Sequence, residues 1–313
     1  MAGCNNSTDG VYDTLSLVIL SSSNGVTVFV CFFAILVTVF LGLFRQTVYR
    51  LALYQVLAAI EVGMVLIAQI HLLNDPDGSF CIAMAFLFTQ AMWAKLILTI
   101  WVTFHLVAFA VFHKNFKKLE IFYLITTLLF SCLVASLPFT TQSYGLSGSW
   151  CWIEDTEDNC EKGTKDTRGI IEQFALWFGP STAILLTTVL AMIVMLVVLA
   201  KRSRPRSENN TTITVTGHYQ NRKALKQLLP LAAYPILFCL FNMFPLADYL
   251  YDALHTSANE SILESVSAVC NAGLGFSTGM ALILHIIMSK FLARNRKYVS
   301  ESGNYGYGAI QHA

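Results

Sequence analysis

The sequence predicts an all-helical integral membrane protein that crosses the bilayer with seven helices. Of its 313 residues, 55% are hydrophobic and 12% are charged, and the mean hydropathy is +0.59. A soluble globular chain carries about a quarter charged residues, so this chain has too few charges for a water-exposed surface. Most of the apolar residues gather in seven long runs.

Each run is long enough to cross a membrane as a helix. A helix needs about 20 mainly apolar residues for this, because lipid cannot hydrogen-bond a free backbone N–H or C=O group. Transmembrane strands would alternate in polarity over about ten residues, and runs such as "STAILLTTVLAMIVMLVVLA" do not alternate. The expected spans are Val26–Phe44, Leu51–Leu73, Ile82–Phe112, Leu119–Phe139, Phe174–Ala200, Leu228–Leu250 and Ile262–Ser289.

The basic residues predict the orientation. Of the 20 lysines and arginines, 16 flank the connections after spans one, three and five or lie in the tail, whereas the opposite side holds Lys162, Lys165 and Arg168. The positive-inside rule therefore predicts an extracellular N-terminus, residues 1–25, and a cytoplasmic tail, residues 290–313, around the transmembrane domain 26–289. In the tail, "KFLARNRKYVS" mixes apolar and basic residues and predicts a short amphipathic helix on the membrane surface.

Glycosylation sequons and cysteines fit the same orientation. Asn5 and Asn6 in "NNST" and Asn259 in "NES" fall on the extracellular side, where we expect glycan. Four cysteines face that oxidising side, and a bridge between Cys81 and Cys151 would hold the second external loop over the third helix. The two others, Cys4 and Cys160, are the candidates for a second pair, while the span cysteines are expected to be small buried hydrophobes: Cys31, Cys132, Cys239 and Cys270.

This arrangement resembles a G protein-coupled receptor, with seven helices, a cysteine that opens helix three and a cysteine in the following external loop. The loop sequence "GSWCWI", residues 148–153, is similar to the Trp-Cys-Trp-Ile of the cyclic AMP receptor-like family and its orphan relatives, and Tyr234-Pro235 adds a weaker similarity. The resemblance implies a plasma-membrane receptor that transduces an extracellular ligand to a heterotrimeric G protein through an outward movement of helix six.

The sequence fits neither a rhodopsin-like receptor nor a light-driven retinal pump. A rhodopsin-like receptor would show Asp-Arg-Tyr after helix three and Asn-Pro-x-x-Tyr in helix seven, where this chain has "VFHKNFKK" and "LILHIIMSK". A retinal protein needs a Schiff-base lysine deep in helix seven, and none lies between Ser261 and Ser289. The expected class is therefore neither of these.

Glu61 and Lys95 are the acid and the base that the sequence places near mid-membrane. Glu61 lies about 10 residues into span two and Lys95 about 13 residues into span three, at about 1.5 Å per residue. Ionisable groups at this depth are costly and therefore candidates for function. Either they form an interhelical ion pair, which switches or stays static, or each is separately hydrated in a polar cavity.

Other polar and aromatic residues predict a ligand pocket that opens outward. For each one alone, a hydrogen bond between helices is the simpler explanation, but together they indicate a polar cavity under the second external loop, whose acidic residues should attract cations. The pocket candidates are Gln69, His71, Gln90, Trp93, Lys95, Asn242, Asp248, Tyr249, Asn271, Trp150 and Trp152.

No pattern for an enzyme, a metal site or a cofactor is present. The seven histidines are scattered, and the sequence lacks a Walker loop and a Gly-x-Ser-x-Gly elbow. We expect the partners to be a G protein, an unidentified ligand and membrane lipids, and no nucleic acid. The alternative function is a small-solute transporter or channel, although the inverted repeats that are usual in transporters are not visible.

Overall fold

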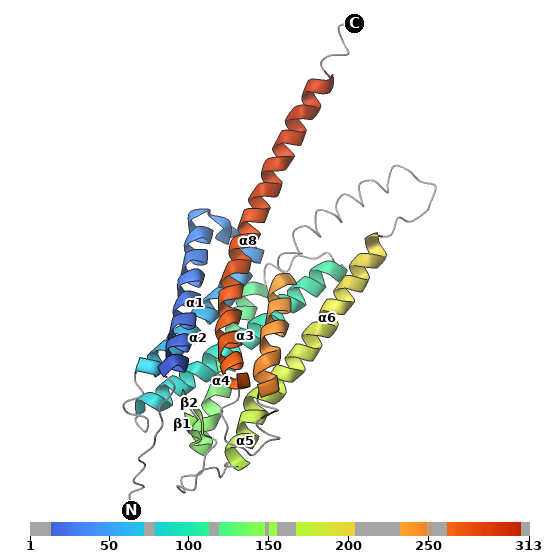
Figure 1. The fold of residues 1–313 in the computed structure, drawn as a ribbon. Coiled ribbons are helices and arrows are strands. Elements are labelled where there is room, and N and C mark those ends of the chain that lie inside the picture. The colour runs from blue at the N-terminus through green and yellow to red at the C-terminus, as the bar shows by residue number, and fades with distance from the viewer. Residues whose placement is uncertain are drawn as a thin grey trace, which may run out of the picture.

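The computed structural model describes residues 14–71, 79–112, 119–147, 150–154, 167–203, 232–248, 251 and 262–307. These residues form a bundle of long helices with a small β-hairpin at one end (Figure 1). The helices are α1 Thr14–Phe40, α2 Thr47–His71, α3 Ser79–Phe112, α4 Glu120–Thr141, α5 Thr167–Gln173, α6 Gly179–Ser203 and α8 Ile262–Tyr307, and residues 232–248 form a further helix.

Six of these helical segments are long and apolar enough to cross a membrane, which confirms the helical class and agrees with a membrane protein. They are Ser21–Phe40, Tyr49–Gln69, Ser79–Ala108, Glu120–Thr141, Arg168–Val198 and Val269–Lys290. Ala232–Asp248 is an apolar helix that is shorter than these six. It lies in the expected sixth span, so a count of seven spans stays a prediction.

The bundle is apolar on its outside as well as in its core. Phe29 is 71% exposed on α1, Phe40 is 83% exposed at the end of that helix, and Leu129 is 67% exposed on α4. Soluble monomers rarely expose apolar surface on this scale. Exposed apolar side chains cost no free energy in the hydrocarbon of a bilayer, so lipid is the environment that suits this surface.

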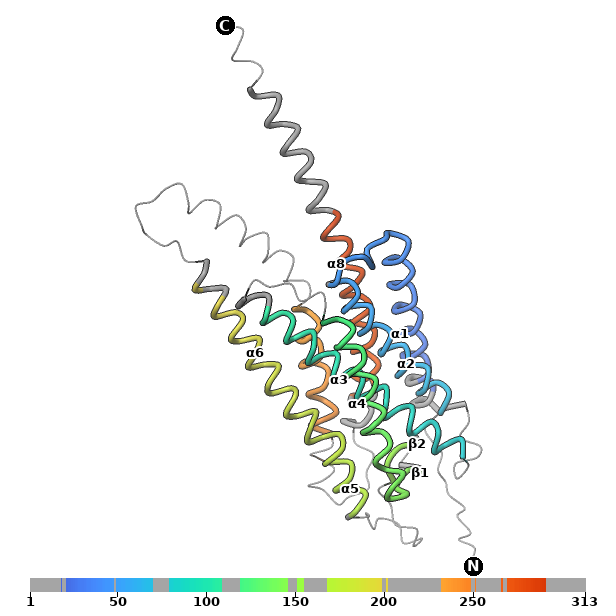
Figure 2. The backbone as a smooth tube through the Cα atoms, turned by 180° about the vertical axis from the view of Figure 1, so that it is seen from behind, coloured from blue at the N-terminus to red at the C-terminus, as the bar shows by residue number. Residues whose placement is uncertain are grey.

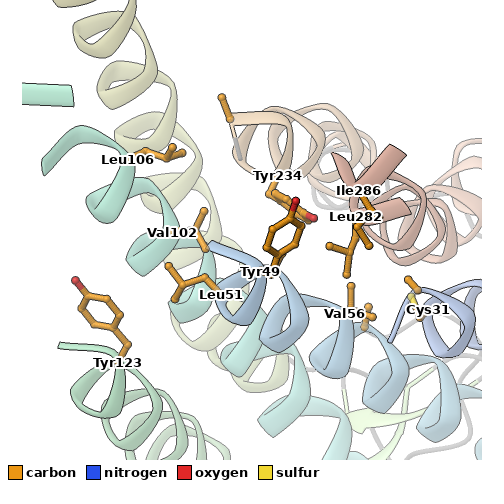
Figure 3. Close-up of a cluster of buried hydrophobic side chains, with 14 of the residues drawn as sticks. Cys31, Tyr49, Leu51, Val56, Val102, Leu106, Tyr123, Tyr234, Leu282 and Ile286 are labelled. Atoms are coloured by element: carbon orange, nitrogen blue, oxygen red, sulfur yellow. The ribbon is translucent and has the colours of Figure 1, made fainter. Parts of the chain in front are cut away.

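α2 and α3 are the most buried of the six spans and form the centre of the bundle. α3 contacts α2, α4 and α6, while α1 packs against α2 and α8. Figure 3 shows the buried cluster where α2 meets α8 and the helix 232–248, with Tyr49, Tyr234 and Leu282 in view. The ring of Tyr49 stacks on His285 with 4.8 Å between centroids, and its hydroxyl donates to Ser289 at 2.9 Å.

α1 and α8 approach each other closely because glycine lies at the contact. A Cβ atom on Gly275 of α8 would lie 2.5 Å from Cγ2 of Thr27 on α1. The Thr27 hydroxyl donates to the carbonyl of Ala272 at 2.9 Å, and the Cys31 thiol donates to the carbonyl of Gly275 at 3.3 Å. Small residues allow this close approach, which is the usual way helices associate in membranes.

The connection after α4 folds back as a hairpin. β1 (Tyr144–Ser147) pairs antiparallel with β2 (Trp150–Ile153), with Leu146 opposite Cys151. The turn out of α4 uses Gln142 in the left-handed conformation (φ 54°), and its N–H donates to the carbonyl of Pro138. The hairpin lies at the end of the bundle where α1 begins (Figures 1 and 2).

The C-terminal helix differs from the expected tail. α8 runs as one helix from Ile262 to Tyr307, so the short amphipathic helix expected after Ser289 is not a separate element among the described residues. No proline or glycine interrupts residues 290–302, and the backbone therefore has no local reason to break there.

Candidate functional site

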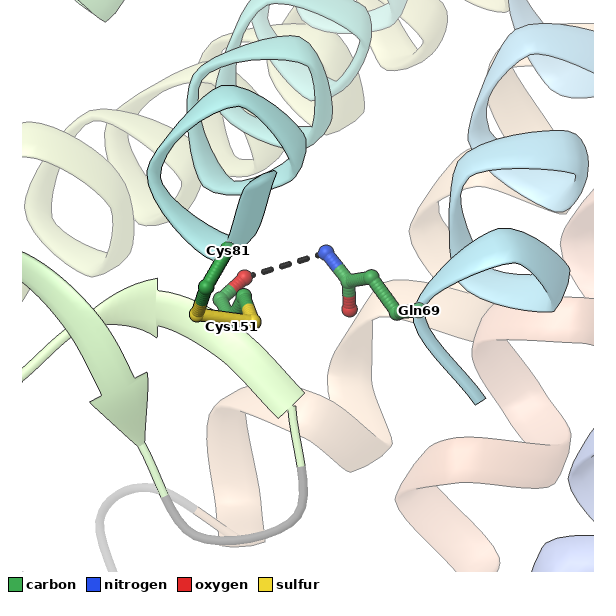
Figure 4. Close-up of a disulfide and its surroundings, with 3 residues drawn as sticks. All are labelled: Gln69, Cys81 and Cys151. Carbon is green, nitrogen blue, oxygen red and sulfur yellow. Dashed lines mark hydrogen bonds between the residues drawn. A yellow bond between two sulfur atoms is a disulfide. The ribbon is translucent and has the colours of Figure 1, made fainter. Parts of the chain in front are cut away.

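A disulfide attaches the hairpin to the start of α3. Cys81, the third residue of α3, is bonded to Cys151 of β2, with 5.3 Å between their Cα atoms (Figure 4). This confirms the pairing expected from the sequence. Cys4 and Cys160, the candidates for a second pair, lie outside the described residues.

Gln69 of α2 makes a second attachment between the helices and the hairpin. Its Nε2 donates to the backbone carbonyl of Cys151 at 3.0 Å, as the dashed line in Figure 4 shows. The residue is 4% exposed, and its Oε1 atom is buried without a hydrogen-bond partner among the described groups. A buried polar atom of this kind costs free energy unless water or a ligand satisfies it.

The hairpin is held from its other side by α4, α5 and an aromatic cluster. Gln173 of α5 donates to the carbonyl of Ile153 at 2.9 Å, and the hydroxyl of Tyr144 donates to the carbonyl of Ala135 at 2.7 Å. Burial raises the pKa of Tyr144 to about 12, so the phenol stays a neutral donor. The indole of Trp152 makes edge contacts with Phe88 and Phe178 at centroid distances of 6.3 and 6.1 Å. The hairpin is therefore a fixed cover for the ends of α2 and α3.

Below this cover, Trp93 of α3 contacts a local distortion between α5 and α6. Residues Phe174–Phe178 form a single π-helical turn, η3. The buried Trp93 donates its indole N–H to the carbonyl of Leu176 at 2.9 Å. A π-helical turn misaligns backbone groups and is frequent at functional sites, and here Trp93 satisfies one of these carbonyls. The apolar sequence "FALWF" carries no signal from which this turn could have been predicted.

Lys95 lies on α3 half a turn further along the helix. It is 7% exposed, and its side-chain ammonium makes no hydrogen bond or ion pair with any described residue, whereas its backbone carbonyl accepts from the Thr99 hydroxyl at 2.9 Å. Glu61 does not compensate it, because the ion pairs within 4.0 Å among the described residues are Arg50–Glu120 and Arg168–Glu172. The structure therefore does not bring together the expected Glu61–Lys95 pair. Glu61 lies with Leu57 and Met64, which are 51% and 58% exposed, on the outward face of α2.

Four of the remaining pocket candidates lie in the described part of the bundle. Asn242 donates to the carbonyl of Phe238 in its own helix at 2.8 Å, and Gln90, Asn271 and Asp248 are half-buried. His71 ends α2 and Trp150 begins β2, but their side chains are not among the described parts of the structure. Tyr249 and the expected glycosylation sites Asn5, Asn6 and Asn259 lie outside the described residues.

At the opposite end of the bundle, a charged network joins α2 to α4. The guanidinium of Arg50 donates from Nε and Nη2 to the two carboxylate oxygens of Glu120, each at 2.5 Å, and the hydroxyl of Tyr54 donates to the same carboxylate at 2.8 Å. Arg50 also donates from Nη1 to the carbonyls of Phe44 and Arg45 at 3.1 and 2.9 Å. One arginine thus connects two helices and the short 3-10 helix η1 (Leu43–Arg45) between α1 and α2.

This network was not predicted from the sequence, because Arg50 was used there only as one of the basic residues that predict the orientation of the chain. The available signal was Glu120, a lone acid at the start of an apolar run on the same side of the membrane as Arg50.

Comparison with known proteins finds no family model that matches the chain and no curated protein similar to it.

Proposed function

We propose that this chain is a G protein-coupled receptor of the plasma membrane, which transduces an extracellular ligand to a heterotrimeric G protein. The observation that carries the proposal is the covered end of the bundle, where the Cys81–Cys151 bridge attaches the Trp-Cys-Trp-Ile strand to α3. The cyclic AMP receptor-like family has a similar loop sequence. The proposal also includes the seventh span, Ala232–Asp248, and the orientation that the basic residues predict.

The ligand would enter beside the disulfide-bonded hairpin. The buried Oε1 of Gln69, which has no hydrogen-bond partner in the described part of the chain, would be an acceptor for a ligand donor group. Trp93, held by the carbonyl of Leu176, offers an indole face deeper in the bundle. Ligand contact with Trp93 would act on α3 and on the π-helical turn together, because one hydrogen bond joins them.

The signal would then reach the cytoplasmic end through the helix 232–248. Pro235 and Pro245 lie within this helix and remove two backbone N–H donors from it. A helix weakened in this way bends more readily than an unbroken one. Its outward movement would uncover a G protein site beside α3 and α6.

The test is reconstitution of the purified full-length protein in lipid vesicles with one G protein of each class. We expect unliganded protein to accelerate nucleotide exchange on at least one class, or to form a stable complex with that G protein once nucleotide is removed. Cys151→Ser should reduce this coupling, whereas the matched change Cys132→Ser, at a free cysteine on α4, should not. Solute flux through the vesicles without exchange or complex formation on any G protein would instead support a transporter or channel.

A further inference from the structure

Glu61, the acid expected to pair with Lys95, is half-buried and lies on the outward face of α2. Leu57, Glu61 and Met64 are spaced i, i+4 and i+7 and therefore share one face of α2, which we call the Glu61 stripe. Leu57 is 51% and Met64 is 58% exposed. The opposite face carries Ala59 and Leu66, which are 2% and 6% exposed. The Glu61 stripe is thus a lipid-facing surface.

Glu61 lies deep in the hydrocarbon region. In the span Tyr49–Gln69 it is 12 residues from one end and 8 from the other, or about 18 and about 12 Å at 1.5 Å per residue. The hydrocarbon core is about 30 Å thick, so headgroup amines at either surface are out of reach of this carboxyl. Among the described residues, the carboxyl group of Glu61 has no hydrogen-bond partner and no ion-pair partner.

A lipid-facing carboxyl at this depth is costly, and such groups usually pair with another group or line a polar path. We propose that the Glu61 stripe is a docking surface for a partner protein whose transmembrane helix carries a lysine or arginine near its midpoint. Charge complementarity carries this assignment. A basic group at the same depth pairs with the ionised carboxylate and hydrogen-bonds it while both stay in hydrocarbon.

A second copy of this chain fits the surface less well. A two-fold contact would place Glu61 against its own equivalent, which brings together like charges. The basic residue at mid-span, Lys95, is 7% exposed inside the bundle and is therefore out of reach of Glu61 on another copy. A partner helix with its own exposed basic residue would avoid both the like-charge contact and the need to reach the buried Lys95.

The test measures association in phosphatidylcholine vesicles between the labelled full-length protein and synthetic single-span peptides. The probe is a leucine-alanine helix with lysine at its centre, and the controls have leucine or glutamate there. We expect energy transfer with the lysine peptide alone. Glu61→Leu and Glu61→Gln should raise the apparent dissociation constant about threefold to thirtyfold, the range for polar contacts between helices in membranes. Glu61→Lys should switch the preference to the glutamate peptide.

Cross-linking locates the contact. A cysteine one turn from the peptide's lysine should form a disulfide with Met64→Cys and not with Leu129→Cys, which is equally lipid-exposed on α4 (67%). Equal association of all three peptides, or association that Glu61→Leu leaves unchanged, would overturn the proposal. Energy transfer between two labelled copies of this chain that Glu61→Leu abolishes would also overturn it, in favour of a self-contact.

Discussion

Replacing Glu120 by glutamine should destabilise the bundle by breaking the charged network that joins α2 to α4. The carboxylate side chain is 9% exposed and accepts two charge-assisted bonds from Arg50, whose side chain is 30% exposed, and one bond from Tyr54. Breaking a fully buried pair costs about 3–5 kcal/mol, an exposed pair contributes about 0–1 kcal/mol, and glutamine retains one neutral hydrogen bond. Between these limits, we expect Glu120→Gln to lower the free energy of unfolding by about 2–3 kcal/mol.

The assay is unfolding of the purified protein in mixed micelles with increasing SDS, followed by tryptophan fluorescence. Trp101 is a local reporter, because its ring stacks on Tyr123 in α4 with 4.6 Å between centroids. The matched control is Glu172→Gln, which removes the i,i+4 pair with the 62% exposed Arg168 and should cost less than about 0.5 kcal/mol.

A double-mutant cycle separates the ion pair from other effects of the substitution. Arg50→Gln and Glu120→Gln together should destabilise by clearly less than the sum of the two single changes. Equal losses from Glu120→Gln and Glu172→Gln, or a coupling energy below about 0.5 kcal/mol, would refute the role assigned to the network.

Two further predictions use the same unfolding assay. Gly275→Ala should cost about 1–3 kcal/mol by overpacking, because the new Cβ would lie 2.5 Å from Cγ2 of Thr27, whereas Gly25→Ala, with open space around it, should stabilise α1 by about 0.5–1 kcal/mol. The opposite order would contradict the α1–α8 packing. Trp93→Phe should cost about 1–2 kcal/mol, because it leaves the carbonyl of Leu176 without its donor, and no loss relative to wild type would argue against that contact.

The sequence predicted features that depend on length and composition better than features that depend on the rotation of a helix. The apolar runs predicted the helical class and most span positions. The disulfide Cys81–Cys151 was predicted because both cysteines fall on the expected oxidising side of the membrane. In contrast, Glu61 and Lys95 were paired from depth alone. The depth of a residue in the membrane follows from counting residues along its helix. The direction in which its side chain points depends on which face of the helix is more apolar, and α2 and α3 are apolar on nearly every face. The sequence pattern around Glu61 therefore gave no indication that this residue lies on the outward face of α2.

The missed parts of the site are contacts between segments far apart in the chain. Arg50 and Glu120 are separated by 70 residues, and each is unremarkable among the charged residues near a membrane surface. Trp93 and the π-helical turn meet through a backbone carbonyl, for which no residue type is diagnostic. Such contacts follow from tertiary packing, which overrides local sequence pattern.

α2 connects the two ends of the molecule that carry these contacts. Gln69 holds the hairpin at one end and Arg50 holds α4 and η1 at the other, about 28 Å apart along a single helix. If α2 transmits movement of the hairpin to the opposite end of the bundle as a rigid rod, Gln69→Leu and Arg50→Gln should couple by more than about 0.5 kcal/mol despite this separation. Additive losses in the same SDS unfolding assay would mean that the two ends are independent, and transmission would then have to run through α3 and its contact with Leu176.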